Sequence, residues 1–340
     1  MTSARAELTP QMLEYAKKFD DRGEIRWLPY LIYFHPADYR SDVVNTDRVG
    51  FRISHGPSGE QASAGGDVPD GPVRLLAGSS TVFGIGATSD AATLPSRLWS
   101  KHAPSAPWLN FGGRSHNSTQ ELLLFVLYRH LLPRVDEIVL FSGFNDLGLS
   151  RLPASMQGDN GAFFNCVEYF EALASVSKQK KPSHGFGRGS RHQAQQPAPE
   201  PVPDLPEQIA RAVDLTTRHL ATWRLLADGL GARLTYVLQP LATWIRDEPA
   251  REERRLFAEL DAISDFGRAY GDIASRESWR AYSTALSEGC AGVGVRFLDM
   301  NTVLADAVAD DDWLFVDRIH FTDEGYDVVA ALLAESLDLE

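Results

Sequence analysis

The chain contains only two cysteines, Cys166 and Cys290, in 340 residues. Two cysteines cannot form the disulfide framework of a small secreted domain or a zinc site with four cysteine ligands. The sequence also lacks a His-Glu-x-x-His zinc motif and a glycine-rich phosphate loop that ends in Lys-Ser or Lys-Thr. It therefore predicts neither a metal site nor a nucleotide-phosphate site.

Basic residues are outnumbered: 33 Lys and Arg face 46 Asp and Glu, for a net charge of −13. This balance disfavours a nucleic-acid surface, which needs clustered cations to neutralise phosphates. No apolar run approaches the roughly 18–20 residues of a membrane helix, and no apolar signal region follows Arg5. We therefore expect a cytoplasmic protein without a membrane span.

Short apolar runs that end at small or polar residues are typical of buried strands, and five occur: 73–77, 107–110, 137–141, 233–238 and 295–299. Helix-like stretches lie between or after them, at 118–131, 207–229, 251–289 and 323–338. Alternating strands and helices predict a parallel sheet covered on both faces. Ligands of such sheets bind beyond the carboxyl ends of the strands.

Two regions lie outside this alternating pattern. Residues 1–70, with helical spacing at 9–20 and many aromatics at 27–39, are expected to form an N-terminal extension that packs on a domain comprising 71–340. Residues 177–206 lack apolar periodicity and are predicted to be a disordered surface insertion. The alternative is a basic tether for a nucleic acid or a protein partner, using Lys178, Lys180, Lys181, Arg188 and Arg191.

Ser80 lies three residues after the first strand-like run, where a helix is expected to begin. A serine there is exposed to a ligand and lies near the positive end of a helix dipole. It becomes a nucleophile once a base removes its proton. The alternative interpretation is a helix N-cap, and Ser79 is the rival nucleophile.

Asp317 and His320 are three residues apart, a spacing that lets the carboxylate orient the imidazole on one tight turn. Asn145 follows the third strand-like run, where its amide could donate to an oxyanion. Each residue also has a structural interpretation: Asp317 and His320 as surface or capping residues, and Asn145 as a turn residue before a helix capped by Asp146.

The four segments 78–80 (Gly-Ser-Ser), 110–118, 143–146 (Gly-Phe-Asn-Asp) and 317–320 (Asp-Arg-Ile-His) together resemble the sequence blocks of the SGNH (GDSL-type) hydrolase superfamily. Residues 45–52 are also similar to a stretch that precedes the core in many bacterial members. The resemblance implies a three-layer α/β/α sandwich with a five-stranded parallel sheet of flavodoxin-like type. It also implies no cofactor and an acyl-serine intermediate.

The resemblance assigns roles residue by residue. It makes Ser80 the nucleophile, His320 the base and Asp317 the group that orients the base. The oxyanion hole would be formed by the backbone N–H groups of Ser80 and Ser115 and by the side chain of Asn145. Two positions depart from the family pattern. Ser79 stands where an Asp is common, and Ser115 stands at the oxyanion glycine, two residues after Gly113.

Further substrate contacts are predicted at four positions beside these blocks: Gly113, Arg114, His116 and Arg318. The two arginines would favour an anionic substrate, unless they are solvated surface residues. Specificity is expected to reside in loops, here 21–40, 151–176 and 243–289.

The sequence favours a serine esterase or thioesterase acting on a small-molecule acyl ester. An acyltransferase that uses the same residues is the nearest alternative. A non-catalytic binding or regulatory protein is the other, and it would show His320 out of hydrogen-bond reach of Ser80 and a filled pocket. Nothing in the sequence indicates an oligomeric state.

Overall fold

The computed structural model describes residues 3–19, 25–167, 169, 202–264 and 266–339. Its central sheet has five strands: β5 (Val73–Gly78), β6 (Trp108–Gly112), β7 (Val135–Ser142), β8 (Arg233–Leu238) and β9 (Arg296–Asp299). They lie in the order β6-β5-β7-β8-β9, and every neighbouring pair is parallel. The predicted five-stranded parallel sheet is confirmed.

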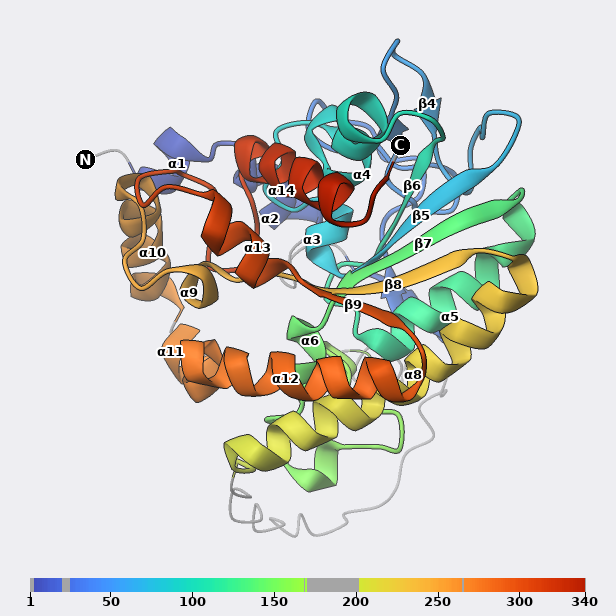
Figure 1. Cartoon of the computed structure of the whole chain (residues 1–340). Helices are drawn as coiled ribbons and strands as arrows, with labels where there is room; N and C mark the ends of the chain where they lie inside the picture. Colours follow the sequence, from blue (N-terminus) through green and yellow to red (C-terminus); the bar gives the residue numbers. More distant parts are fainter. Residues whose placement is uncertain (1–2, 20–24, 168, 170–201, 265, 340) are drawn as a thin grey trace, which may run out of the picture.

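Helices cover both faces of this sheet (Figure 1). One face carries α5 (Ser118–Tyr128), α8 (Leu205–Leu230) and α12 (Arg276–Gly292). The other carries α3 (Ser80–Phe83), α4 (Leu94–Arg97), α13 (Met300–Ala307) and α14 (Asp323–Ser336). The three-layer α/β/α architecture is therefore confirmed.

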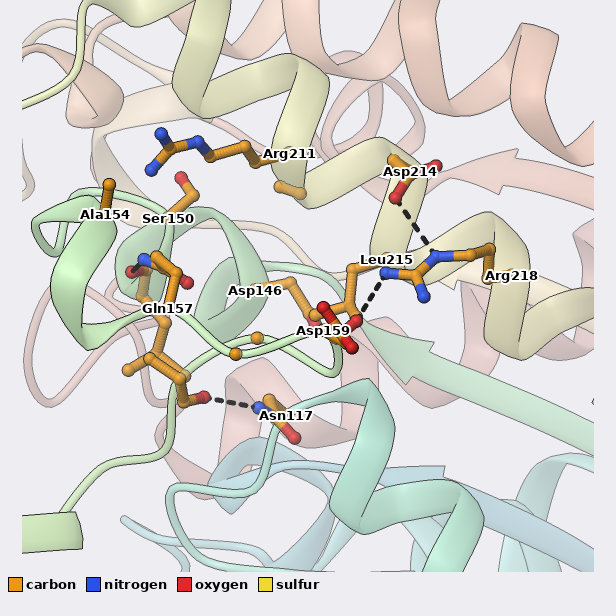
Figure 2. A pocket seen from close by; sticks show the side chains of 15 residues that line it. Asn117, Asp146, Ser150, Ala154, Gln157, Asp159, Arg211, Asp214, Leu215 and Arg218 are labelled. Carbon is orange, nitrogen blue, oxygen red and sulfur yellow. Dashed lines mark hydrogen bonds and ion pairs between the residues drawn. The ribbon is translucent and has the colours of Figure 1, made fainter.

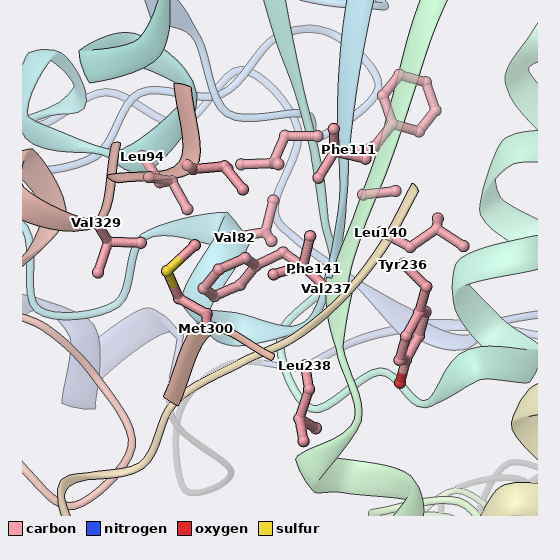
Figure 3. Packing of buried hydrophobic residues seen from close by; sticks show 14 of the residues in the cluster. Val82, Leu94, Phe111, Leu140, Phe141, Tyr236, Val237, Leu238, Met300 and Val329 are labelled. Atoms are coloured by element: carbon pink, nitrogen blue, oxygen red, sulfur yellow. The ribbon is translucent and has the colours of Figure 1, made fainter. Parts of the chain in front are cut away.

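Burial on both faces explains why the strands read as continuous apolar runs rather than alternating ones. In β7, Val139, Leu140 and Phe141 are successive and all buried. Figure 3 shows side chains of these strands packing against Val82, Met300 and Val329 from the helices of one face. Each such side chain contributes about 1.5–3 kcal/mol to stability when fully buried.

The strand order places a topological switch point at β5. This strand is the first of the five in the chain, and its successors β6 and β7 lie on opposite sides of it. Because the connections leave in opposite directions, a crevice forms at the carboxyl ends of these strands. The segments that carry Ser80, Ser115 and Asn145 follow β5, β6 and β7, so they meet at this crevice.

The N-terminal part of the chain packs against the sheet domain. It contains α1 (Ala4–Leu8), α2 (Met12–Lys18) and the two-stranded sheets β1–β2 (Arg26–Leu28, Ile32–Phe34) and β3–β4 (Ser54–His55, Gln61–Ala62). Leu31, Phe34 and Phe51 belong to the same buried cluster as the strands of the sheet. The domain boundary at 70/71 stays a prediction.

One predicted helical stretch, 251–289, is divided in the structure. It forms α10 (Arg251–Ile263), α11 (Phe266–Tyr270), a short 3₁₀ turn (Gly271–Ala274) and then α12. The division has a local cause, because the Ser275 side chain accepts a hydrogen bond from the Ser278 N–H, and serine is among the best residues to start a helix.

Two further short helices, α6 (Phe144–Leu149) and α9 (Ala242–Ile245), follow β7 and β8. Most of the insertion predicted at 177–206 lies outside the described residues, and its last two residues already belong to α8.

Candidate active site

Ser80 is the first residue of α3, two residues after the end of β5. The helix approaches strand β6 so closely that a Cβ on Gly112 would lie 2.1 Å from the Phe83 nitrogen, which only glycine avoids. This contact holds α3, and with it the residue that carries the Ser80 hydroxyl, close against β6. That hydroxyl lies 2.7 Å from Nε2 of His320.

Asp317 and His320 lie on a tight turn closed by a bridge between Phe315 and Phe321, as their spacing predicts. Oδ2 of Asp317 is 2.8 Å from Nδ1 of His320. The other carboxylate oxygen accepts from the backbone N–H groups of Ile319 and His320, both at 2.8 Å. The turn thereby holds the carboxylate and the imidazole in one orientation.

Burial by itself would raise the pKa of Asp317, but attraction to His320 and the hydrogen bonds to the carboxylate outweigh it and hold the pKa below its ordinary value. An ionised carboxylate only accepts hydrogen bonds, so Nδ1 of His320 carries the proton in this contact. With the proton on Nδ1, Nε2 is the ring nitrogen placed to accept from the Ser80 hydroxyl. This is the proton arrangement that a serine nucleophile requires.

Ser79, the rival nucleophile, points elsewhere. Its side chain is buried, and its hydroxyl donates to Oε1 of Gln239 at 3.2 Å. Of the two serines, Ser80 has the hydrogen bond to the imidazole.

Asn145 lies at the start of α6 and faces the same space as Ser80. Its Nδ2 donates one hydrogen bond to the backbone carbonyl of His116 at 2.7 Å. A carbonyl can only accept, so this contact fixes which end of the amide is the donor. Because this hydrogen bond holds the amide group in place, it also fixes the direction of the second N–H.

The loop after β6 carries both Ser115, the predicted oxyanion residue, and Gly113, a predicted substrate contact two residues earlier. The Gly113 N–H donates to the Gly78 carbonyl at 2.9 Å, so this donor is engaged in holding the loop. Ser115 has a left-handed backbone with φ of 55° and lines the cavity over Ser80. The structure thus brings Ser115, and not Gly113, to the cavity.

A cavity of about 270 Å³ opens over Ser80 and His320. Its lining is largely apolar and aromatic: Met12, Tyr15, Ala16, Phe19, Ile85, Phe144, Phe164, Leu260, Tyr270, Val316 and Ile319, with Arg5, Arg114, Ser115, Asn145 and Asp317 as polar members. Phe164, Leu260 and Tyr270 come from the segments predicted to shape the pocket. The contribution of α2 was not predicted, because its apolar spacing alone cannot show what that face covers.

Three predicted substrate contacts do not line this cavity. Gly113 is covered by the ring of His116, which is itself fully buried and lies 5.6 Å from the ring of Tyr33. Arg318 forms an ion pair with Asp261 and stacks on Phe257. Arg114 does line the cavity, with its guanidinium over Tyr33.

Within the described ranges, no three His, Cys, Asp or Glu side chains gather in a way that could hold a metal ion. Both cysteines are free thiols. Among the helices of the described residues, none combines the length and the apolarity needed to cross a membrane.

Comparison with solved structures finds hydrolases at low identity. The lipase/acylhydrolase from Enterococcus faecalis is 13% identical, with a TM-score of 0.44 over 78% of this chain and 95% of that one. The carbohydrate acetylesterase family member from Sinorhizobium meliloti is 13% identical, with a TM-score of 0.40 over 78% and 97%. A member of the lipolytic protein G-D-S-L family from Veillonella parvula is 12% identical, with a TM-score of 0.40 over 78% and 98%.

No curated protein sequence matches the chain. The family model of the GDSL-like Lipase/Acylhydrolase family matches residues 76–328, which is well over half of the 340 residues and includes both Ser80 and His320. The chain therefore belongs to the GDSL-like lipase/acylhydrolase family.

Proposed function

We propose that this protein hydrolyses a carboxylic ester or thioester of a small molecule through an acyl-serine intermediate. The observation that carries the proposal is the continuous hydrogen-bond chain from the Ser80 hydroxyl through His320 to Asp317, which faces an open cavity. A non-catalytic relative was expected to show a broken chain and a filled pocket, and neither is present in this site.

In the first half of the reaction, Oγ of Ser80 attacks the acyl carbon while Nε2 of His320 takes the hydroxyl proton. Asp317 stabilises the imidazolium that forms and keeps its Nδ1–H directed away from the substrate. The carbonyl oxygen becomes an oxyanion that accepts from the Asn145 amide and from the backbone N–H groups of Ser80 and Ser115. His320 then protonates the leaving alcohol or thiol as the acyl–O or acyl–S bond breaks.

The second half repeats these steps with water. His320 takes a proton from a water molecule, the hydroxide attacks the acyl-serine, and the proton returns to Oγ of Ser80 as the carboxylic acid leaves. The apolar lining of the cavity supports an apolar acyl or alcohol group, because burying such a group in it is favourable. The prediction of a cytoplasmic location stands beside this proposal as a prediction.

The test combines turnover with mapping of the nucleophile. The wild-type protein is assayed with p-nitrophenyl acetate, butyrate and octanoate, and separately treated with a fluorophosphonate and digested for mass spectrometry. We expect turnover and a phosphonate adduct on Ser80. An adduct without turnover would point to a specialised acyl donor or to acyl transfer. Neither signal in folded protein would contradict the proposal.

A further inference from the structure

Helix α3, which begins with Ser80, is a single turn of four residues. A helix this short is unstable alone, and its terminal carbonyl groups need partners from outside the helix. Two partners come from the sheet domain. Nδ2 of Asn110 donates to the Val82 carbonyl at 2.9 Å, and the Tyr326 hydroxyl lies 3.1 Å from the Thr81 carbonyl.

The remaining partners come from the N-terminal part of the chain. The Tyr15 hydroxyl lies 2.8 Å from the carbonyl oxygens of both Gly84 and Ala87. Nη1 of Arg52 donates to the Gly84 carbonyl at 2.8 Å and to the Phe83 carbonyl at 3.1 Å. Tyr15 and Arg52 are remote in sequence from α3, yet they bind the carbonyl groups at its C-terminal end. Ser80 is the first residue of the same helix.

The contacts of Tyr15 and Arg52 are only two hydrogen bonds away from Ser80. The N–H of Gly84 donates to the backbone carbonyl of Ser80 at 2.9 Å, and the N–H of Ile85 does so at 3.1 Å. Gly84 has a left-handed backbone with φ of 95°, which ends the helix at this point. Any movement of the Gly84 peptide is consequently transmitted to Ser80.

Arg52 is itself held rigidly. Its Nε forms an ion pair with Oδ1 of Asp90 at 2.7 Å, both side chains are buried, and its Nη1 donates to the Tyr15 hydroxyl at 2.9 Å. A buried guanidinium is tolerated only when it is paired and hydrogen-bonded, so its position is fixed by these partners. Burial raises the pKa of Tyr15 to about 12, and the phenol keeps the proton that it donates.

Tyr15 also lines the cavity over Ser80. We propose that Tyr15 and Arg52 are positioning residues for the Ser80 nucleophile, so that the N-terminal part of the chain sets the geometry of the active site as well as one wall of its cavity. This inference rests on the proposed serine chemistry. It predicts that loss of the Tyr15 hydroxyl slows attack by Ser80 without altering the apolar surface that the substrate contacts.

The decisive variant is Tyr15→Phe, with Tyr39→Phe as its matched control. Tyr39 lies in the same N-terminal part, and its hydroxyl donates to Glu14 on α2 and not to α3. Both changes remove one phenolic hydroxyl from the N-terminal part, but only that of Tyr15 contacts the Gly84 carbonyl and Arg52. Because misplacement of a reacting group by about 1 Å can cost about 10²-fold in rate, we expect Tyr15→Phe to lower kcat and the fluorophosphonate labelling rate by about tenfold. KM should stay within about twofold of wild type.

Thermal unfolding of both variants is measured first, and activity is compared well below either midpoint. Labelling of Tyr15→Phe at the wild-type rate, or an equal loss in Tyr39→Phe, would overturn the positioning role. A wild-type protein that is neither labelled nor active would instead overturn the proposed function itself.

A second variant keeps the test independent of Tyr15. Arg52→Lys retains the charge but has one nitrogen in place of the three that now reach Asp90, Val43 and Gly84. We expect a loss of labelling rate at least as large as that of Tyr15→Phe. The double variant should lose less than the product of the two single effects, because both residues hold the same carbonyl. Strictly multiplicative losses would contradict a shared role.

Discussion

The turn at 317–320 and the first turn of helix α6, at 143–146, each bring an aspartate to the carboxyl ends of the strands. The two carboxylates differ in their surroundings. Asp317 is partly exposed and is bound by His320 and two backbone N–H groups, which hold its pKa below the ordinary value against the effect of burial. Asp146 is almost fully buried. Burial raises its pKa to about 6, although the Ser118 hydroxyl donates to it at 2.6 Å.

The difference shows that the hydrogen-bond partners of a carboxylate, and not its position at the sheet edge, decide whether it is suited to catalysis or to holding the structure together. Asp317 is ionised and faces an imidazole, so it can stabilise positive charge there. Asp146 accepts from both the hydroxyl and the backbone N–H of Ser118, and thereby ties the turn after β7 to the start of α5.

The cavities beside the two aspartates also differ in what surrounds them. Asp146 borders a cavity of about 590 Å³, larger than the one over Ser80 (Figure 2). In Figure 2 the polar groups of its wall bind one another: Arg218 pairs with Asp214, and Nδ2 of Asn117 donates to the Ala162 carbonyl. A choice by size alone would therefore favour the cavity that neither Ser80 nor His320 lines.

The largest expected effect is that of Ser80→Ala, compared with Ser118→Ala. Removing the proposed nucleophile should abolish fluorophosphonate labelling and lower kcat by about 10⁵-fold or more. Ser118 is also buried, and its hydroxyl donates to Asp146 and lies 2.9 Å from Nδ1 of His219. The order differs from that at Ser80, because here the serine lies between the aspartate and the imidazole. Its alanine variant should still be labelled; the opposite pattern would reverse the assignment.

Asp317→Asn should follow in size, compared with Asp146→Asn. An amide in place of Asp317 favours the wrong tautomer of His320, and kcat is expected to fall by about 10⁴-fold. Asparagine at 146 can still accept a hydrogen bond from Ser118, so about tenfold or less should be lost there. Steady-state kinetics on a p-nitrophenyl ester measure both; equal losses would remove the distinction between the two turns.

A smaller effect is expected for Asn145→Ala, compared with Asn117→Ala. Loss of one oxyanion donor costs about 10²–10³ in kcat. Asn117 instead caps α5, because its Oδ1 accepts from the Gln120 N–H at 3.1 Å. Its alanine variant should lose about 1 kcal/mol of stability and little activity. Urea unfolding together with kcat separates these outcomes, and a kcat insensitive to Asn145→Ala would exclude the amide from the oxyanion hole.

The smallest effect concerns pH and stability. The pKa of Asp146 rises on folding from 3.8 to about 6, so between these values the folded chain holds a proton that the unfolded chain has released. The free energy of unfolding contributed by this group must then fall as pH rises across that window. The stability of wild type relative to Asp146→Asn should decline from pH 4 to 6 and level off above it. Parallel urea-unfolding curves at all pH values would contradict the raised pKa.

Much of the fold could be predicted from local patterns. The five strands were predicted within about two residues, because strands buried on both faces must be continuously apolar. The long segment 251–289 was predicted less well, since apolar spacing continues through the breaks that Ser275 and its neighbours impose.

The chemistry of the site stays a prediction, and its walls were predicted in part, because Phe164, Leu260 and Tyr270 come from predicted segments whereas α2 does not. The family resemblance grouped Ser80, Asp317 and His320, and in the structure these three side chains form one hydrogen-bonded chain. His116 was expected at the substrate, yet it is buried against Gly113, because a sequence block does not show which side chains face inward.

By itself the sequence determined the succession of strands and helices along the chain and the family, and it predicted the residues for serine chemistry, since these depend on local periodicity and short motifs. Only the tertiary structure decided that α2 forms a wall of the cavity, that Tyr15 and Arg52 hold the helix of Ser80, and that Asp317 and Asp146 have opposite pKa shifts. The physical reason is that burial and electrostatic environment arise from groups far apart in the chain, which become neighbours only when it folds.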